Sequence, residues 1–220
     1  ETPSLLMLLF FIFAPMATNV LGGLLSEGVN KVLTLGGLGF VDTGAEMAKE
    51  VATSPSFFLA LYTCLLAPLF EELVFRNYLL RGMEKPRPWL AVVLSGVMFA
   101  LMHTNLDQSI GLLFTAIYFS YLGMRYSMWV PILVHIGNNT IFYLASLFPS
   151  GDGTVMQTVL IGMSLFGIIS GVIVLVSALK YYRKRVNLRQ GEKPRYLSNA
   201  FFWMYFVLCG ILIVLNDYVL

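Results

Sequence analysis

The sequence predicts an all-α protein, a bundle of about seven transmembrane helices that forms a single integral membrane domain over residues 1–220. Hydrophobic residues make up 58% of the chain and charged residues 12%, against roughly 45–50% and 25% in soluble domains. The mean hydropathy is positive. Several apolar runs reach about 20 residues, enough to cross a hydrocarbon core. We therefore expect lipid around the chain and no nucleic-acid partner.

The apolar runs are separated by charged, glycine-containing or proline-containing turns, and proline cannot continue a helix. The first run is interpreted as a span rather than a signal peptide, because no basic stretch precedes it in the sequence. The chain begins at Glu1 rather than at methionine, so we leave open a segment upstream. The expected spans are 5–25, 57–80, 89–103, 110–125, 129–148, 155–179 and 199–220.

Three smaller features carry expectations of their own. The interval 36–56 is expected to be an ordinary connector, although Thr43 and Glu46 have the capping-box spacing of a short surface helix. Gly167 and Gly171 fit the small-xxx-small pattern, which predicts packing within the bundle, with dimerisation as the alternative. The two cysteines lie in separate apolar runs and are expected to be small buried hydrophobes.

Basic residues gather on one side of this topology. The opposite loops carry mainly acidic residues, and basic residues in short loops mark the cytoplasmic side. We therefore expect the N-terminus inside and the C-terminus outside. The segment 180–195 is the densest basic stretch and is taken as a topology signal, with contact to anionic headgroups as the alternative. The basic side would hold 12 of the 14 Lys and Arg residues, all except Lys31 and Lys49.

Few ionisable residues fall inside the predicted spans, where a charge is costly and is a functional candidate by default. They include two adjacent acids, Glu71 and Glu72, and both histidines of the chain, His103 and His135. Glu72 is four residues before Arg76 and is suited to a salt bridge, whereas Glu71 points about 100° away.

Asn139 lies four residues after His135, so the two share one helix face. Counted from the span ends, the two histidines, Glu71 and Asn139 reach comparable depths and could line one cavity. A carboxylate with a neutral imidazole can deprotonate a water, and an imidazole with an amide can stabilise an oxyanion.

Other interpretations of these residues remain open. The histidines and Asn139 could be packing residues, and Glu72 with Arg76 could be a structural ion pair near the membrane interface. Two histidines and Glu71 could supply three zinc ligands, but His-Glu-x-x-His is absent from the sequence, so we favour a site without metal or cofactor. An ion-coupled transporter would also use such residues, but we find no inverted repeat.

Three short motifs resemble the CAAX protease and bacteriocin-processing family, also called the Abi family. They occur in the family's order, within a motif-bearing core at 57–148. The motifs are Glu71-Glu72-Leu-Val-Phe-Arg76, Phe99-Ala-Leu-Met-His103 and His135-Ile-Gly-Asn-Asn139.

The resemblance implies a glutamate-type intramembrane endopeptidase. Glu71 and His103 would activate the water, His135 and Asn139 would form the oxyanion hole, and Glu72, Arg76 and Phe99 would support the site. The implied substrate is a membrane-associated peptide or lipidated protein, with bacteriocin immunity as a non-catalytic alternative. A bacterial cytoplasmic membrane is the expected location, and the oligomeric state is not predicted.

Overall fold

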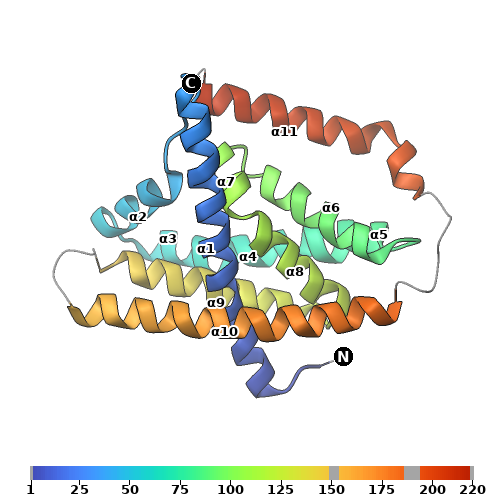
Figure 1. Cartoon of the computed structure of the whole chain (residues 1–220), viewed down its shortest axis with the longest axis horizontal. Helices are drawn as coiled ribbons and strands as arrows, with labels where there is room; N and C mark the ends of the chain where they lie inside the picture. Colours follow the sequence, from blue (N-terminus) through green and yellow to red (C-terminus); the bar gives the residue numbers. More distant parts are fainter. Residues whose placement is uncertain (1, 149–153, 186–193, 219–220) are drawn as a thin grey trace.

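A computed structural model describes residues 2–148, 154–185 and 194–218, and all regular structure within these ranges is helical (Figure 1). The predicted turn at 149–153 lies outside the described residues, as does 186–193, which is half of the basic segment 180–195.

All seven apolar runs predicted from the sequence form helices. The run at 57–80 is one continuous helix, Phe57–Met83, built from three α-helical and two π-helical pieces. The run at 110–125 begins within the short helix α7 and continues in α8. The elements are α1 Leu5–Leu35, α2 Thr43–Thr53, α3 Phe57–Leu61, η1 Tyr62–Leu66, α4 Ala67–Glu72, η2 Leu73–Leu80, α5 Arg81–Met83, α6 Pro88–Leu101, α7 Leu106–Gly111, α8 Leu113–Arg125, α9 Trp129–Ser146, α10 Thr154–Arg185, η4 Arg195–Ser198 and α11 Ala200–Tyr218.

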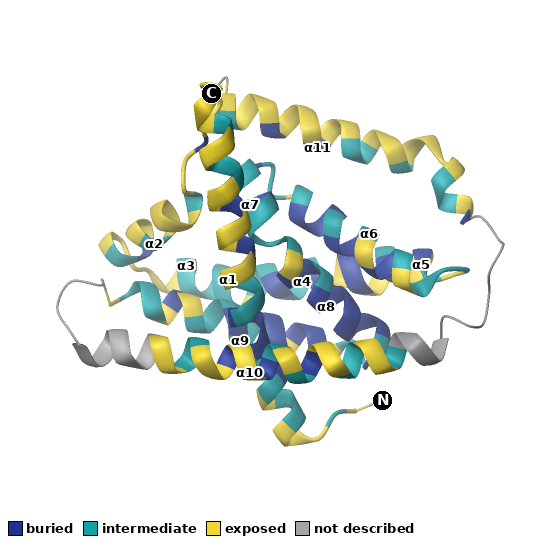
Figure 2. Ribbon diagram, viewed as in Figure 1, coloured by how far each residue is buried: buried dark blue, intermediate teal, exposed yellow. Residues whose placement is uncertain are grey.

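The all-α membrane bundle is confirmed, although its helices differ in how well each could cross a bilayer alone. Within the described residues, four helices are long and apolar enough: Leu5–Leu35, Phe57–Met83, Ile161–Tyr181 and Ala200–Tyr218. The other three predicted spans correspond to α6, α8 and α9. At 14, 13 and 18 residues they are shorter. Helix α8 is mostly buried, whereas α6 and α9 are each partly buried and partly exposed (Figure 2).

The expectation of an ordinary connector at 36–56 was wrong. Residues Thr43–Thr53 form helix α2, and the cap is Asp42, whose side chain accepts a hydrogen bond from the backbone N–H of Ala45. An Asp side chain suits this position because it satisfies one of the free N–H groups of the first turn. The sequence spacing from Thr43 to Glu46 had indicated a helix start one residue late.

The long helices α1, α10 and α11 lie on the outside of the bundle, where they expose many large side chains (Figure 2). Helix α1 crosses α10, and α11 lies along the opposite edge near α6 (Figure 1). A Cβ on Gly167 would lie 2.7 Å from Cβ of Met16, and one on Gly171 would lie 3.0 Å from Cβ of Ala17. The small-xxx-small pattern therefore serves packing within the bundle, as predicted, because only small residues permit this approach of α10 to α1.

Polar contacts join the ends of alternate helices on one side of the bundle. Asp107 of α7 accepts from the Ser26 hydroxyl of α1 at 2.5 Å and from the Thr43 hydroxyl of α2 at 2.9 Å. Asp217 of α11 accepts from the Asn105 amide at 2.7 Å. These are the ends that the alternating topology assigns to the acidic side.

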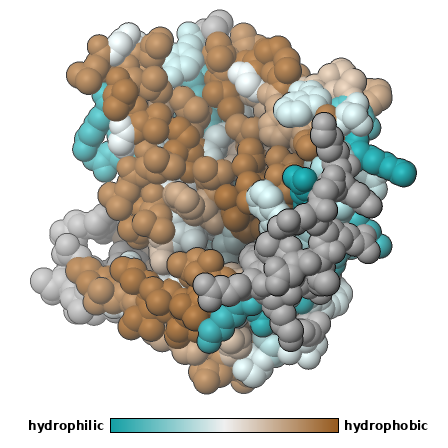
Figure 3. Space-filling view, turned by 45° about the vertical axis from the view of Figure 1, so that its right-hand side comes forward, coloured by the Kyte–Doolittle hydropathy of each residue, from teal (hydrophilic) through white to brown (hydrophobic). Residues whose placement is uncertain are grey.

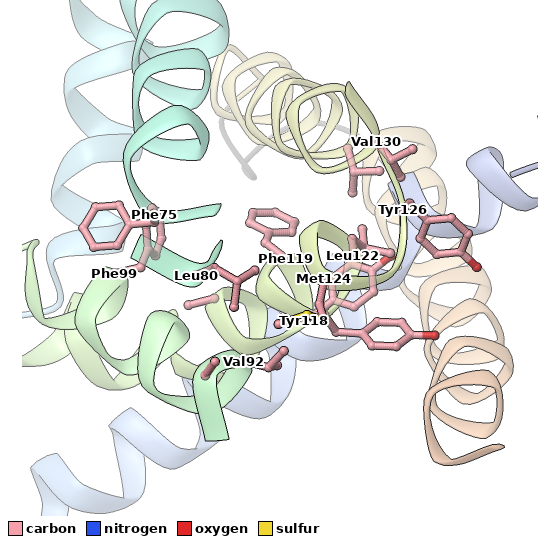
Figure 4. Packing of buried hydrophobic residues seen from close by; sticks show 14 of the residues in the cluster. Phe75, Leu80, Val92, Phe99, Tyr118, Phe119, Leu122, Met124, Tyr126 and Val130 are labelled. Atoms are coloured by element: carbon pink, nitrogen blue, oxygen red, sulfur yellow. The ribbon is translucent and has the colours of Figure 1, made fainter. Parts of the chain in front are cut away.

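Most of the visible surface is apolar (Figure 3). Helices α1, α10 and α11 expose many large hydrophobic side chains, as expected for helices that face lipid. The buried core lies around α8 and includes Phe75, Phe99, Phe119 and Leu122 (Figure 4). This core carries the charged and imidazole side chains described next.

Candidate active site

The acidic pair lies on a helix interrupted twice by π-helical turns. Residues Tyr62–Leu66 and Leu73–Leu80 are π-helical, and the α-helical turn Ala67–Glu72 between them carries Glu71 and Glu72. Such π turns are rare and are frequent at functional sites. Each one changes the direction of the following side chains relative to a regular helix.

Pro68 explains a free carbonyl beside the first π turn. There the N–H of Ala67 bonds the carbonyl of Tyr62, five residues back. With the same spacing, the carbonyl of Thr63 would pair with residue 68, which is a proline and has no N–H. The side chain of Asn139 on α9 donates to this carbonyl at 3.0 Å instead. Asn139 therefore satisfies a backbone group that would otherwise remain unpaired within the membrane.

Glu72 and Arg76 form a buried ion pair. Arg76 Nε lies 3.3 Å from Glu72 Oε2, and both side chains have 0% exposure. The guanidinium stacks on Phe99, 4.3 Å from the ring centre, and Nη2 donates to the carbonyl of Ala116 at 3.0 Å. Gly123 leaves room for the arginine stem, since a Cβ there would lie 2.9 Å from Arg76 Cγ. The predicted pairing is confirmed, but the pair is buried in the bundle rather than near the interface.

His135 lies between the two acids. Its Nδ1 is 2.9 Å from Glu72 Oε1, and its Nε2 is 3.7 Å from Glu71 Oε2. Because a carboxylate only accepts, Glu72 accepts from Nδ1–H of His135. Nε2 is then the ring nitrogen that faces Glu71. Glu71 keeps 22% of its side chain exposed, so it is the more accessible of the two acids.

His103 lies just beyond the end of α6 rather than within the helix. Its Nδ1 is 3.1 Å from the carbonyl of Phe99. A carbonyl only accepts, so Nδ1 carries the proton and Nε2 is left as a base. The next residue, Thr104, has a φ of +52°, a strained value for a β-branched residue of the kind found near functional sites. His103 is within electrostatic range of Glu71 and His135.

Phe99 connects these groups. Its ring centre is 5.1 Å from that of His103 and 5.9 Å from that of His135, in edge-on contacts. The structure therefore places His135 beside both acids and joins it to His103 through Phe99. Asn139 lies one helical turn from His135 and contacts the acidic helix at Thr63. Together these side chains provide two imidazoles, one accessible carboxylate and an amide, a set able to activate water and to donate to an oxyanion.

Sequence reasoning missed the polar residues that contact Asn139. Asn138 donates to Asn139 Oδ1 at 3.2 Å, and Asn19 of α1 donates to Asn138 Oδ1 at 3.2 Å. A signal was present, because Thr18 and Asn19 are the polar residues within the first apolar run. Polar groups in such runs face the bundle interior and find partners there.

Residues 53–141 match the family described as type II CAAX prenyl endopeptidase Rce1-like. We call residues 53–141 the Rce1-like segment, after the family that they resemble. The segment contains all three motifs, and the resemblance inferred from them is confirmed. Helices α1, α10 and α11 lie outside the Rce1-like segment.

Two curated bacterial proteins are similar to the chain. UPF0177 protein YbdI of Lactococcus lactis subsp. lactis (strain IL1403) is 37% identical over 70 residues, 32% of this chain and 33% of YbdI. YdiL of Bacillus subtilis (strain 168), named as a candidate membrane peptidase, is 28% identical over 116 residues, 49% of this chain and 47% of YdiL. The matches thus span about a third and about half of these relatives. No solved structure matches the chain significantly.

Within the described residues, no group of three or more His, Cys, Asp or Glu side chains has an arrangement that could hold a metal ion. In the candidate zinc set of Glu71, His103 and His135, the Nδ1 atoms of both histidines already bond Phe99 and Glu72. A shared ligand role would fall to the two Nε2 atoms.

Proposed function

We propose that this chain is a membrane-embedded endopeptidase, similar to the CAAX proteases, that hydrolyses a peptide bond by activating water. The observation that carries the proposal is the position of His135 between two carboxylates, 2.9 Å from Glu72 and 3.7 Å from Glu71. A purely structural pair of Glu72 and Arg76 would need neither the second acid nor the second histidine. The Rce1-like segment and the relative named as a candidate membrane peptidase give independent support.

In the proposed mechanism Glu71 and His103 share the activation of water. Glu71 is the more accessible acid, and His103 Nε2 is the free nitrogen of its ring. The water attacks the scissile carbonyl, and its proton passes to Glu71 or His103 and then to the leaving amine. Water-poor surroundings strengthen each of these electrostatic interactions.

His135 and Asn139 are proposed to stabilise the oxyanion of the tetrahedral intermediate. Asn139 has two amide hydrogens, and one of them is engaged by Thr63. The other is proposed to donate to the oxyanion. His135 can donate from Nε2 only when both ring nitrogens carry protons, because Nδ1–H is used by Glu72. The two adjacent carboxylates would balance the charge of that imidazolium.

We propose a peptide or lipidated protein as substrate, reaching the site from the lipid or from the cytoplasmic side. The proposed setting is a bacterial cytoplasmic membrane with the N-terminus inside, because basic residues concentrate at one end of the spans and both relatives are bacterial. Neither a metal nor a cofactor is required by the proposed chemistry.

The test compares protein termini in membranes of cells that express the wild-type chain or Glu71→Gln. New termini should form with the wild type and be lost with Glu71→Gln at equal expression, because the variant keeps the side-chain volume and loses the basic oxygen. Glu27→Gln is the matched control, since Glu27 is an exposed acid of α1 paired with Lys31. If the termini are identical while an immunity phenotype survives in Glu71→Gln, the chain is a non-catalytic binding protein.

A further inference from the structure

A file of hydrogen-bonded polar side chains leads from α1 and α8 to the acidic helix. The Thr115 hydroxyl donates to Asn19 Oδ1 at 2.6 Å, and Asn19 Nδ2 donates to Asn138 Oδ1 at 3.2 Å. Asn138 Nδ2 donates to Asn139 Oδ1 at 3.2 Å, and Asn139 Nδ2 donates to the Thr63 carbonyl at 3.0 Å. The file thus joins four helices of the bundle: α8, α1, α9 and the helix that carries the acids.

The donors in this file all point the same way, for a chemical reason. The Thr63 carbonyl can only accept, so Asn139 must present its NH₂ to Thr63 and its oxygen to Asn138. Asn138 must then present its NH₂ to Asn139, and the same constraint passes to Asn19. Hydrogen bonds aligned in one direction polarise and strengthen one another in surroundings of low dielectric constant.

We propose that Asn19 and Asn138 are positioning residues of the peptidase site, acting through Asn139. They hold the Asn139 carboxamide with its NH₂ on the acidic helix, and this sets the spacing between that helix and His135 of α9. The inference rests on the proposed function. It extends the site beyond the Rce1-like segment, because α1 lies outside residues 53–141.

A positioning role for Asn19 can be distinguished from simple helix packing, because the two predict different effects of combined mutations. Asn19 is three hydrogen bonds from the acidic helix, so its effect on the site must pass through Asn138 and Asn139. Residues that act in series are non-additive, because once the last link is gone the earlier links have nothing to transmit. A residue that only stabilises the fold would add its cost in any background.

The kinetic test uses the purified full chain in liposomes and a fluorogenic peptide ending in a farnesylated Cys-aliphatic-aliphatic-X sequence. Asn19→Ala should lower kcat about tenfold or more with KM within about twofold, since misplaced catalytic groups cost rate. In an Asn139→Ala background, Asn19→Ala should cause no further loss. Asn30→Ala is the matched control, because Asn30 is on the same helix and bonds Phe40 outside the file. A full additional loss in the Asn139→Ala background, or unchanged turnover in Asn19→Ala, overturns the inference.

A second measurement does not depend on cleavage. Cys64 follows Thr63 and is half-buried, whereas Cys209 is buried on α11, and both are free thiols. Asn19→Ala should raise the rate of N-ethylmaleimide labelling at Cys64 several-fold and leave the labelling rate of Cys209 unchanged. The control variant Asn30→Ala should leave both rates at their wild-type values. An unchanged Cys64 rate overturns the inference even if the chain cleaves the peptide. Conversely, faster Cys64 labelling without any cleavage by the wild type contradicts the proposed function alone.

If Asn19→Ala exposes both cysteines equally, the variant has lost its fold, and Thr115→Val decides instead. This change removes the first donor at nearly constant volume. Faster labelling confined to Cys64 supports the file, and wild-type rates at both cysteines overturn it.

Discussion

At the scale of residues, the two adjacent acids have different surroundings because a helix turns by about 100° per residue. Glu72 is turned into the core, where its side chain has 0% exposure and meets both Arg76 and His135. Glu71 is turned toward the site and keeps 22% exposure. The structural role therefore belongs to Glu72, and the proposed chemical role belongs to Glu71.

Glu72→Gln should lower the stability of the protein as well as its activity. Removing the carboxylate leaves Arg76 as an uncompensated charge with 0% exposure, and breaking a buried pair in this way costs about 3–5 kcal/mol. Thermal unfolding in detergent measures the effect. Glu84→Gln is the control, because its pair with Arg81 is partly exposed and is worth little. Equal melting temperatures for wild type and Glu72→Gln would contradict the role of this ion pair.

Chelation should leave peptide cleavage intact. In the proposed mechanism the carboxylate of Glu71 and the imidazole of His103 supply the base, so a divalent ion is not needed. Cleavage is measured before and after dialysis of the purified protein against a strong chelator. Loss of cleavage that zinc restores would instead make Glu71, His103 and His135 metal ligands.

At the scale of elements, prolines inside two helices expose backbone carbonyls that side chains of other helices then use. Pro15 of α1 leaves the carbonyl of Phe11 free, and the Tyr118 hydroxyl of α8 donates to it at 3.0 Å. Pro68 leaves the carbonyl of Thr63 free for Asn139 in the same way. At each proline, a hydrogen bond that is missing within one helix is replaced by a hydrogen bond between two helices.

Pro68→Ala should reduce cleavage without lowering the melting temperature. Alanine restores an N–H that can bond the carbonyls of the π turn and displace Asn139 from Thr63, and it is the better helix former. Cleavage rate and thermal unfolding are measured together. Pro131→Ala is the control, because Pro131 lies in the first turn of α9, where a missing N–H has no consequence. Full activity in Pro68→Ala would show that the Asn139 contact is not needed.

At the scale of the whole molecule, the site depends on helices outside the Rce1-like segment. Helix α1 contacts α7, α8, α9 and α10, and it carries Asn19. The close contact of α10 with α1 requires glycine at position 167, since a Cβ on Gly167 would lie 2.9 Å from the carbonyl oxygen of Phe13. The crossing of α1 and α10 therefore bears on the position of α1 against the site.

Gly167→Leu should destabilise the protein, by about 1–3 kcal/mol as for other overpacked sites. The added side chain has no room at the crossing and must push α10 away from α1. Melting temperature in detergent is the measurement. Gly162→Leu on the same helix is the control, because that position is exposed and a Cβ there meets nothing within 4 Å. Similar melting of the two variants would contradict the predicted crossing.

Much of the fold and the identity of the candidate site residues could be predicted from the sequence. Length and polarity of the apolar runs indicated every long helix, and the spacing of Glu72 and Arg76 indicated their ion pair, because these depend on local periodicity. Helix α2 was missed in favour of a connector, because it lies in the longest polar interval of the sequence, although the capping-box spacing had indicated a short helix there. The site residues were gathered by motif order and depth, whereas their roles remain proposals.

The sequence by itself determined the all-α membrane fold, the motif-bearing core and the residues able to carry chemistry, because hydrophobicity and residue type act locally. Only the tertiary structure decided that His135 lies between both acids, that two π turns redirect the acidic helix, and that Asn19 joins the site from α1. The contacts of His135 and Asn19 join residues up to 119 positions apart in the chain, and they follow from the packing of helices rather than from the pattern within any one of them.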